Sequence, residues 1–115
     1  MPPSSFHNPV EKVSEEEIRR IFNEGRYFER VQSGELLATL KRNSHPDRPI
    51  KGEPRCARSQ TLYYFTKDHE LVAVVHQYMR PDGTLGLSGR PDPKAMYLSD
   101  RTIYVPSRMP KTTNN

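Results

Sequence analysis

Residues 71–80 read LVAVVHQYMR, and this run decides the fold that we predict. Successive side chains of a β-strand point to opposite faces of a sheet. One face of such a strand carries mostly apolar side chains: Leu71, Ala73, Val75, Gln77 and Met79. The opposite face begins with valines and ends in three larger polar groups: His76, Tyr78 and Arg80. We therefore expect the first face to pack against helices and the second face to be exposed at its end.

A hairpin partner for this strand precedes it in the chain. Residues 61–66, TLYYFT, are rich in residues that favour strands, and the polar residues 67–70 separate the two runs. A turn centred on Asp68 and His69 predicts these opposed pairs: Ser59 with Tyr78, Thr61 with His76, Tyr63 with Val74 and Phe65 with Val72. This register places the partners of His76 and Tyr78 on the same face as those two side chains.

The N-terminal part of the chain predicts helices. Ser14 followed by Glu17 is a capping-box pattern, and the acidic residues 15–17 suit the positive end of a helix dipole. Apolar residues at 18, 21 and 22 form one stripe, and Gly25 is a natural stop. We expect a helix over residues 14–24. Two shorter helices should follow in residues 26–42, with a break at residues 33–34, although residues 35–40 are alternatively a strand.

The remaining strands complete a small sheet. Leu85 and Leu87 suggest a third short strand, and residues 101–105 suggest a last one. Residues 71–75 are apolar on both faces, which predicts a central strand whose second neighbour is one of these two. The fold class that we expect is α+β, with N-terminal helices packed on one face of a small antiparallel sheet of three to four strands. An extended arm at 1–13, a single domain at 14–106 and a flexible tail at 107–115 make up the chain.

The net charge of +4 is concentrated in one segment. Residues 41–58 contain two acidic residues and six basic ones: Lys41, Arg42, Arg48, Lys51, Arg55 and Arg58. Three prolines and a glycine argue against regular structure from residue 43 to residue 58, so we expect a long basic loop. A loop of this kind attracts phosphate-rich or acidic partners, or it only aids solubility.

The lone cysteine and the absence of targeting signals indicate a compartment. Cys56 excludes an internal disulfide framework and fits a reducing environment. No secretory signal and no run long enough to span a membrane is visible, so we expect a cytoplasmic protein. His45, Asp47, Cys56 and His76 are of metal-ligand type, but their spacing matches no zinc pattern. We expect no metal, no cofactor and no membrane contact.

The polar end of the strand at 71–80 suits nucleic acid. A guanidinium binds phosphate, an aromatic ring stacks on a base, and an imidazole exchanges a proton near neutral pH. We expect a small basic domain that binds nucleic acid, with RNA favoured, alone or within a larger assembly. The candidate contacts are Lys41, Arg42, Arg48, Lys51, Arg55, Arg58, Tyr63, His76, Tyr78, Arg80 and Arg90.

Two other functions fit the same residues. One is a protein-interaction adaptor or inhibitor that contacts an acidic protein surface and no nucleic acid. The other is a metal-independent endoribonuclease of the toxin kind, in which His76 acts on a 2′-hydroxyl and Arg80 and Arg90 stabilise the charge that develops. Only His45 is available as a second acid-base group. Binding is therefore favoured over catalysis. The interpretation to be weighed against all three functions is an ordinary exposed strand end in which His76 has no function.

Overall fold

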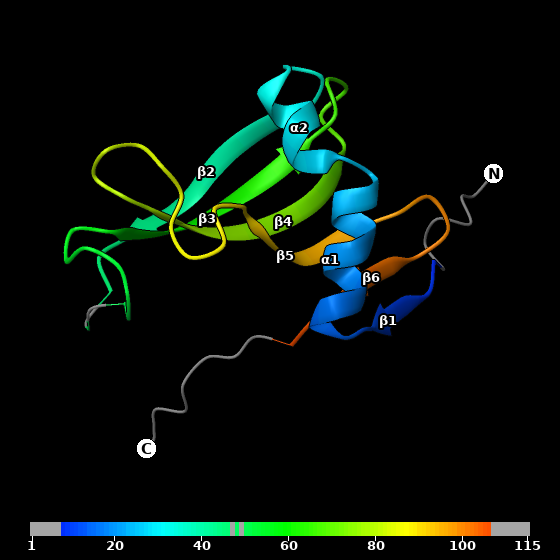
Figure 1. The fold of residues 1–115 in the computed structure, drawn as a ribbon. Helices are drawn as coiled ribbons and strands as arrows, with labels where there is room; N and C mark the ends of the chain where they lie inside the picture. The colour runs from blue at the N-terminus through cyan, green and yellow to red at the C-terminus, as the bar shows by residue number, and fades with distance from the viewer. Residues whose placement is uncertain (1–7, 47, 49, 107–115) are drawn as a thin grey trace.

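The frame of the chain is a mixed sheet of six strands in the order β1–β6–β5–β4–β3–β2. A computed structural model describes residues 8–46, 48 and 50–106 (Figure 1). The strands are β1 (Val10–Lys12), β2 (Leu37–Ser44), β3 (Arg58–Phe65), β4 (Leu71–Met79), β5 (Asp92–Tyr97) and β6 (Thr102–Tyr104). The helices α1 (Glu15–Glu24) and α2 (Tyr27–Gln32) lie between β1 and β2 in the chain. Strands β1 and β6 run parallel, and every other neighbouring pair is antiparallel.

The hairpin of β3 and β4 has the predicted register over most of its length. The confirmed pairs are Ser59 with Tyr78, Thr61 with His76, and Tyr63 with Val74. The expected pair of Phe65 with Val72 is wrong, because the register shifts after Tyr64 and Phe65 pairs with Leu71. A bulge of this kind leaves one residue unpaired and bends the strand. Because the shift lies next to the turn, it leaves the polar end of β4 in the expected orientation.

The predicted fold class is wrong in the size and composition of the sheet. In place of three to four antiparallel strands covered by N-terminal helices, six strands form a mixed sheet. The two helices have ten and six residues and are too short to cover it. A strand also precedes the helices, since β1 lies within the segment expected to be an arm and pairs with β6. Residues 1–7 of that segment and the expected tail at 107–115 lie outside the described residues.

Strand β5 is the main element that the sequence did not reveal. It pairs with β4, which is therefore central as expected, but this second neighbour is neither of the two candidates. Proline at positions 91 and 93 disfavours a strand in this segment. Pro93 lies opposite Val75, where the register of the two strands shifts, and a strand tolerates proline at such an irregular position. Leu85 makes only an isolated bridge to Met79, whereas β6 confirms the predicted last strand.

Helix α1 forms where the sequence predicts it. The Ser14 hydroxyl accepts the backbone N–H of Glu17 at 3.0 Å, and Gly25 follows the last turn. On the exposed side, the guanidinium of Arg20 pairs with Glu17 at 2.8 Å and with Glu24 at 3.0 Å. Pairs at this spacing add a few tenths of a kcal/mol each to a helix. The helix is therefore specified locally, by its cap and its charge pattern.

The segment after α2 forms a strand instead of the expected helix. Helix α2 ends at Gln32 with Ser33 as its C-cap, and Gly34 follows with a φ of 90°, which glycine adopts without strain. The chain then extends into β2, which begins two residues later than the alternative strand at 35–40. Every residue of β2 is exposed, Leu37 and Leu40 included, whereas Leu36 just before the strand is buried.

The core lies between α1 and one face of the sheet. Ile18 and Phe22 of α1 are fully buried. They pack with buried residues of the strands and of the segment after β6: Tyr64, Ala73, Val75, Met96, Ile103 and Val105. The ring of Phe22 lies 5.6 Å from that of Tyr27 and 6.1 Å from that of Tyr64. The predicted inward face of β4 is therefore confirmed at Ala73 and Val75.

Substitution of Phe22 by alanine tests this packing. The side chain is fully buried between two rings, so Phe22→Ala should lower the free energy of unfolding by about 3–5 kcal/mol. Asn23→Ala, one residue further along α1, removes an exposed side chain and should cost less than about 0.5 kcal/mol. Urea unfolding of the two variants measures the difference. Equal losses would mean that α1 is not packed on the sheet as described.

Candidate functional site

The face of the sheet opposite to the core carries the candidate site. Strand register places side chains from all six strands on this face, and no helix of the described residues covers it (Figure 1). We call it the helix-free face and define it by three rows across the strands: Thr39–Tyr63–Val74–Ala95–Tyr104–Lys12, Arg42–Thr61–His76–Asp92 and Ser44–Ser59–Tyr78. Aromatic, hydroxyl and basic groups dominate these rows, and Asp92 is their single acidic member.

His76 and Tyr78 lie next to each other at the polar end of β4. The imidazole centre is 4.8 Å from the centre of the Tyr78 ring, edge to face, and its Nε2 atom is 2.7 Å from the Ser59 hydroxyl. Burial lowers the pKa of His76, and the ammonium of Lys94 lowers it further against the opposing effect of Asp92. The imidazole is therefore mainly neutral at pH 7, and it offers a ring and a hydrogen-bonding nitrogen more than a charge.

Further rings extend the aromatic character of this side of the sheet. The rings of Tyr63 and Phe65 lie 6.4 Å apart on β3, and Nζ of Lys41 lies 5.3 Å from the centre of the Tyr63 ring. A cation over the face of a ring is attracted by its quadrupole. Tyr97 on β5 and Tyr104 on β6 are 38% and 36% exposed. Rings are thus presented by four neighbouring strands.

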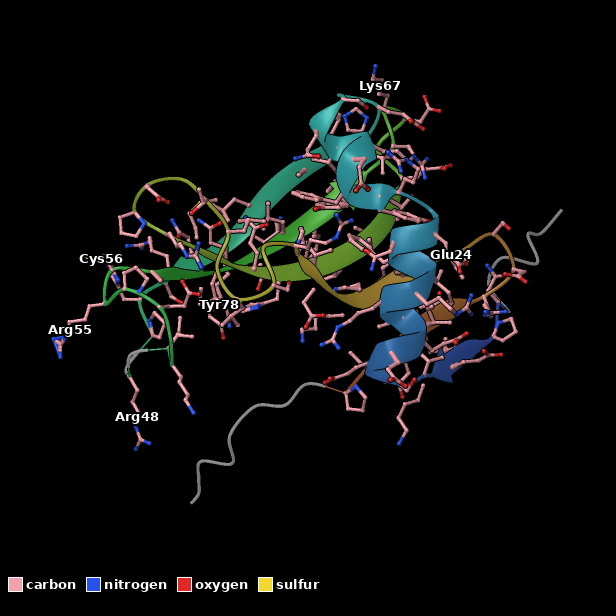
Figure 2. The ribbon with its side chains drawn as sticks, in the orientation of Figure 1. Glu24, Arg48, Arg55, Cys56, Lys67 and Tyr78 are labelled. Carbon is pink, nitrogen blue, oxygen red and sulfur yellow. The ribbon has the colours of Figure 1, made fainter. Side chains whose placement is uncertain are left out.

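Five of the predicted basic contacts have no acidic partner among the described residues: Lys41, Arg42, Arg48, Lys51 and Arg55. Lys41 and Arg42 belong to the exposed edge strand β2. Arg48 and Arg55 project away from the sheet on the loop between β2 and β3 (Figure 2). The basic segment therefore supplies uncompensated charge at the β2 edge of the sheet.

The guanidinium of Arg58 binds other residues of the protein, on the side of the sheet opposite to the helix-free face. Its Nε donates to Oδ1 of Asn43 at 2.7 Å, and its Nη1 lies 2.6 Å from Nε2 of His45. Arg58 is two residues from the buried Gln60, which shares the core face with Tyr64. His45 is therefore held on the face opposite to His76. The structure does not bring together the two imidazoles that the ribonuclease hypothesis requires.

A buried carboxylate binds Arg80. Glu53 comes from the basic loop, and its side chain is only 2% exposed. Its oxygens accept from Nε and Nη2 of Arg80 at 2.7 and 3.1 Å, and one of them also accepts the backbone N–H of Leu87 at 2.8 Å. These hydrogen bonds, that from Arg80 first, lower the pKa of Glu53 to about 2. A methyl group on Gly86 would lie 2.7 Å from the carboxylate, so the close approach requires glycine at this position.

The sequence predicted Arg80 and Arg90 as exposed contacts, and both are engaged within the protein. The Glu53–Arg80 clamp fastens the basic loop to the end of β4. Arg90 donates to Glu29 at 3.0 Å and lies 5.3 Å from the ring centre of Phe28, both of which belong to α2. The one signal for the clamp in the sequence is that Glu53 is one of two acidic residues in a basic segment. That signal identifies no partner.

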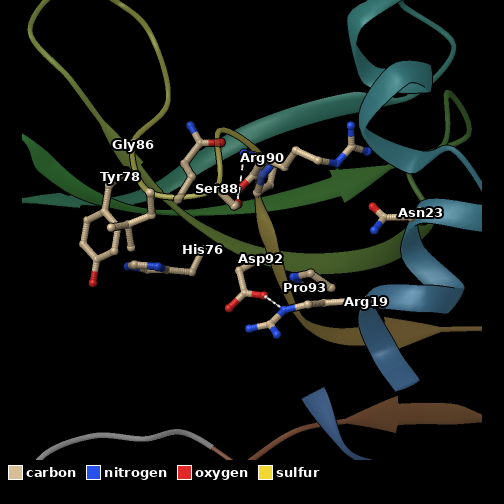
Figure 3. Close-up of a pocket in the computed structure, with 12 residues that line it drawn as sticks. Arg19, Asn23, His76, Tyr78, Gly86, Ser88, Arg90, Asp92 and Pro93 are labelled. Carbon is tan, nitrogen blue, oxygen red and sulfur yellow. Dashed lines mark hydrogen bonds and ion pairs between the residues drawn. The ribbon is translucent and has the colours of Figure 1, made fainter. Parts of the chain in front are cut away.

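A pocket of about 400 Å³ opens beside the polar end of β4 (Figure 3). Its walls come from α1, β4 and residues 86–93, and include Arg19, Asn23, His76, Tyr78, Pro91 and Asp92. Nε of Arg19 donates to Asp92 at 2.8 Å, and Nζ of Lys94 donates to the same carboxylate at 3.1 Å. Burial alone would raise the pKa of Asp92, but these two hydrogen bonds outweigh it and lower the pKa. Asp92 is therefore an anion that its neighbours neutralise.

The described residues supply little for metal chemistry. Within residues 8–46, 48 and 50–106, no group of three or more His, Cys, Asp or Glu side chains could hold a metal ion. Cys56 is exposed on the basic loop as a free thiol, apart from the pocket. No helix in these ranges is long and apolar enough to cross a membrane.

Neutralising Glu53 should give a stability change that depends on pH. The pKa of the folded state, about 2, lies below the usual 4.5, so the carboxylate stabilises the fold above pH 4.5 and loses this effect as the pH falls through 2. Glu53→Gln should therefore lower the urea midpoint at pH 7, and the difference from wild type should shrink between pH 4.5 and pH 2. The exposed Glu24→Gln is the control and should have a small effect at pH 7. A difference for Glu53→Gln that stays constant with pH would contradict the clamp.

No protein-family model, no curated protein and no solved structure matches the chain. The contacts and charges of the chain itself are therefore the basis on which a function is assigned.

Proposed function

We propose that this protein binds single-stranded nucleic acid, with RNA favoured, across the helix-free face. The observation that carries the proposal is the combination of rings from four strands with uncompensated charge at the β2 edge of the same sheet. Bases and phosphates are the two groups that every nucleotide presents, and the face offers a partner for each. Sheet-based and groove-based binders of single strands use the same combination of stacking and positive charge.

The rings supply the contacts to bases. Tyr63, Tyr78 and Tyr104 lie on neighbouring or next-neighbouring strands, and Tyr104 is 36% exposed. Each ring in such a position can stack on an unpaired base, which contributes about 1–3 kcal/mol per base and tolerates any base. The neutral imidazole of His76, held against Ser59, adds a planar group without adding charge. The rings therefore favour a strand whose bases are unpaired.

The free cations supply the contacts to phosphates. Lys41, Arg42, Arg48, Lys51 and Arg55 have no acidic partner among the described residues. In this proposal Lys41 leaves the ring of Tyr63 when a base arrives and pairs with the phosphate of that nucleotide. Arg58, Arg80 and Arg90 have a different role, because their guanidiniums bind groups of the protein and hold its loops. They are positioning residues and not contacts.

Hydroxyl groups on the face favour RNA. Thr39, Ser44, Ser59 and Thr61 occupy the rows on β2 and β3, beside the rings. The 2′-hydroxyl of a ribose is both a donor and an acceptor, and a serine or threonine can pair with it in either sense. A DNA strand of the same sequence lacks this group. Weaker binding of DNA is therefore expected from the same surface.

Removal of one free cation tests the charge contacts. For a labelled RNA of about ten nucleotides, a length within the usual range for a single-strand site, Lys41→Gln should weaken binding at low salt. It should also reduce the slope of log affinity against log salt by about 0.7, the value for one phosphate contact on a single strand. Arg20→Gln on α1 changes the net charge equally and should leave both quantities unchanged.

Three outcomes of this titration contradict the proposal. An affinity for RNA that does not change with salt concentration would exclude the phosphate contacts. Equal effects of Lys41→Gln and Arg20→Gln would show that RNA follows the net charge and not the face. If RNA does not bind at any salt concentration, nucleic acid is excluded as the partner. The alternative partner for the same cations is then an acidic protein surface.

Replacement of one ring tests the stacking contacts. Tyr63→Leu keeps an apolar side chain but removes the ring, and it should weaken RNA binding by about 1–3 kcal/mol. Tyr63→Phe keeps the ring and should bind RNA as the wild type does. Fluorescence anisotropy with the same labelled RNA measures both, and thermal unfolding checks that each variant is folded. Equal binding by the leucine and phenylalanine variants would exclude Tyr63 as a stacking contact.

A further inference from the structure

We infer that the pocket beside His76 and Tyr78 binds one nucleotide unit, with the base inside and the phosphate at its rim. The inference rests on the proposed function, because it gives the strand on the helix-free face a defined end. The pocket volume of about 400 Å³ lies within the range of sites that enclose a small molecule. It is a concave site joined to an otherwise open surface.

The position of the pocket connects it with the face. His76 and Tyr78 belong to the rows of the helix-free face and also line the pocket. The row Arg42–Thr61–His76–Asp92 runs from the cationic edge strand to the pocket across four strands. From strand spacing this path is about 14 Å long. A strand of nucleic acid that starts at the β2 edge and follows this row therefore reaches the pocket.

The inner walls suit a heteroaromatic base. Leu87, which is 57% exposed, offers apolar surface beside the ring of Tyr78, and the buried Pro91 and Pro93 also line the pocket. Gln77 donates through Nε2 to Gln60 at 2.9 Å, so its Oε1 atom is left as an acceptor. The side-chain amide of Asn23 has no hydrogen-bond partner among the described residues, and Figure 3 shows it on the α1 side of the pocket. Amides supply both donors and acceptors, which the edge of a base requires.

The rim suits a phosphate. Arg19 lies there with its side chain 48% exposed, and it donates through Nε to Asp92 and through Nη2 to Glu15. Its Nη1 donors have no partner among the described residues. Because Arg19 and Lys94 neutralise Asp92, an incoming anion does not meet a free negative charge. A guanidinium with spare donors at the mouth of an apolar pocket fits a nucleotide better than an uncharged nucleoside.

One nucleotide could come from two sources, the end of an RNA strand or a free nucleotide. Both present the same base, ribose and phosphate to the pocket. The test therefore uses the four nucleoside 5′-monophosphates singly, and a ten-nucleotide RNA with and without a 5′-phosphate. Calorimetry on the full chain measures each affinity. Preference for the phosphorylated RNA identifies a strand end, and equal binding of both RNAs together with a monophosphate identifies a free nucleotide.

A variant that fills the pocket should separate it from the face. Asn23→Leu introduces a bulky apolar group at an exposed helix position and should weaken binding of the monophosphate at least ten-fold. Glu24→Leu introduces the same leucine one residue further on, outside the pocket lining, and because it removes a negative charge it should not weaken binding of the monophosphate. Tyr63→Leu should weaken binding of the RNA and leave binding of the monophosphate unchanged. Thermal unfolding confirms that all three variants are folded.

The outcomes distinguish the inference from the proposed function. If the RNA binds and depends on Tyr63, but no monophosphate binds at millimolar concentration and Asn23→Leu has no effect, the pocket inference is overturned and the face remains. If a monophosphate binds and Asn23→Leu abolishes it while no RNA binds, the proposed function is overturned and the pocket is a free-nucleotide site. If neither ligand binds, both are overturned.

Discussion

Strand β4 has to satisfy two environments at once, and the remainder of the structure follows from how it does so. Ala73 and Val75 are fully buried against α1, while His76 and Tyr78 turn to the opposite face. Since side chains alternate strictly, a slip of one residue would bury the imidazole in the core and expose the valine. The pairs with β3 on one side and β5 on the other fix this register. The pairing of β4 with these two strands therefore sets which residues lie side by side in each row of the helix-free face.

The Glu53–Arg80 clamp applies the same logic to the loops. A carboxylate with 2% of its side chain exposed is very costly to bury unless its oxygens are paired. Arg80 and the Leu87 amide provide that pairing, and in doing so they hold the basic loop and residues 86–87 at the end of β4. Gly86 completes the arrangement by leaving room for the carboxylate. Arg80, which the sequence suggests as an exposed contact, therefore helps to position residues 86–87 in the wall of the pocket.

What the sequence predicts correctly depends on local signals. The cap and stripe of α1, the alternation in β4 and most of the β3–β4 register are encoded within a few residues of each other. Strand β5 and the six-stranded sheet depend on pairing between distant segments, and prolines at 91 and 93 disguise β5. For the site, the free cations are predictable because basic residues outnumber acidic ones six to two in residues 41–58. The partners of Arg80 and Arg90 lie 27 and 61 residues away, and no local pattern identifies them.

The distribution of charge argues for a single strand over a duplex. A duplex presents phosphates on both sides of each groove, so a protein that binds it needs cations on both flanks of the contact surface. Here five cations without an acidic partner among the described residues lie on β2 and the loop after it, against Lys12 at the β1 end of the rows, and the central row ends at Asp92, which Arg19 and Lys94 neutralise. Rings lie between these two ends, and a paired base cannot stack on them without leaving its helix. A strand that enters with its phosphates over the cationic edge and lays unpaired bases on the rings uses each part of this asymmetric surface.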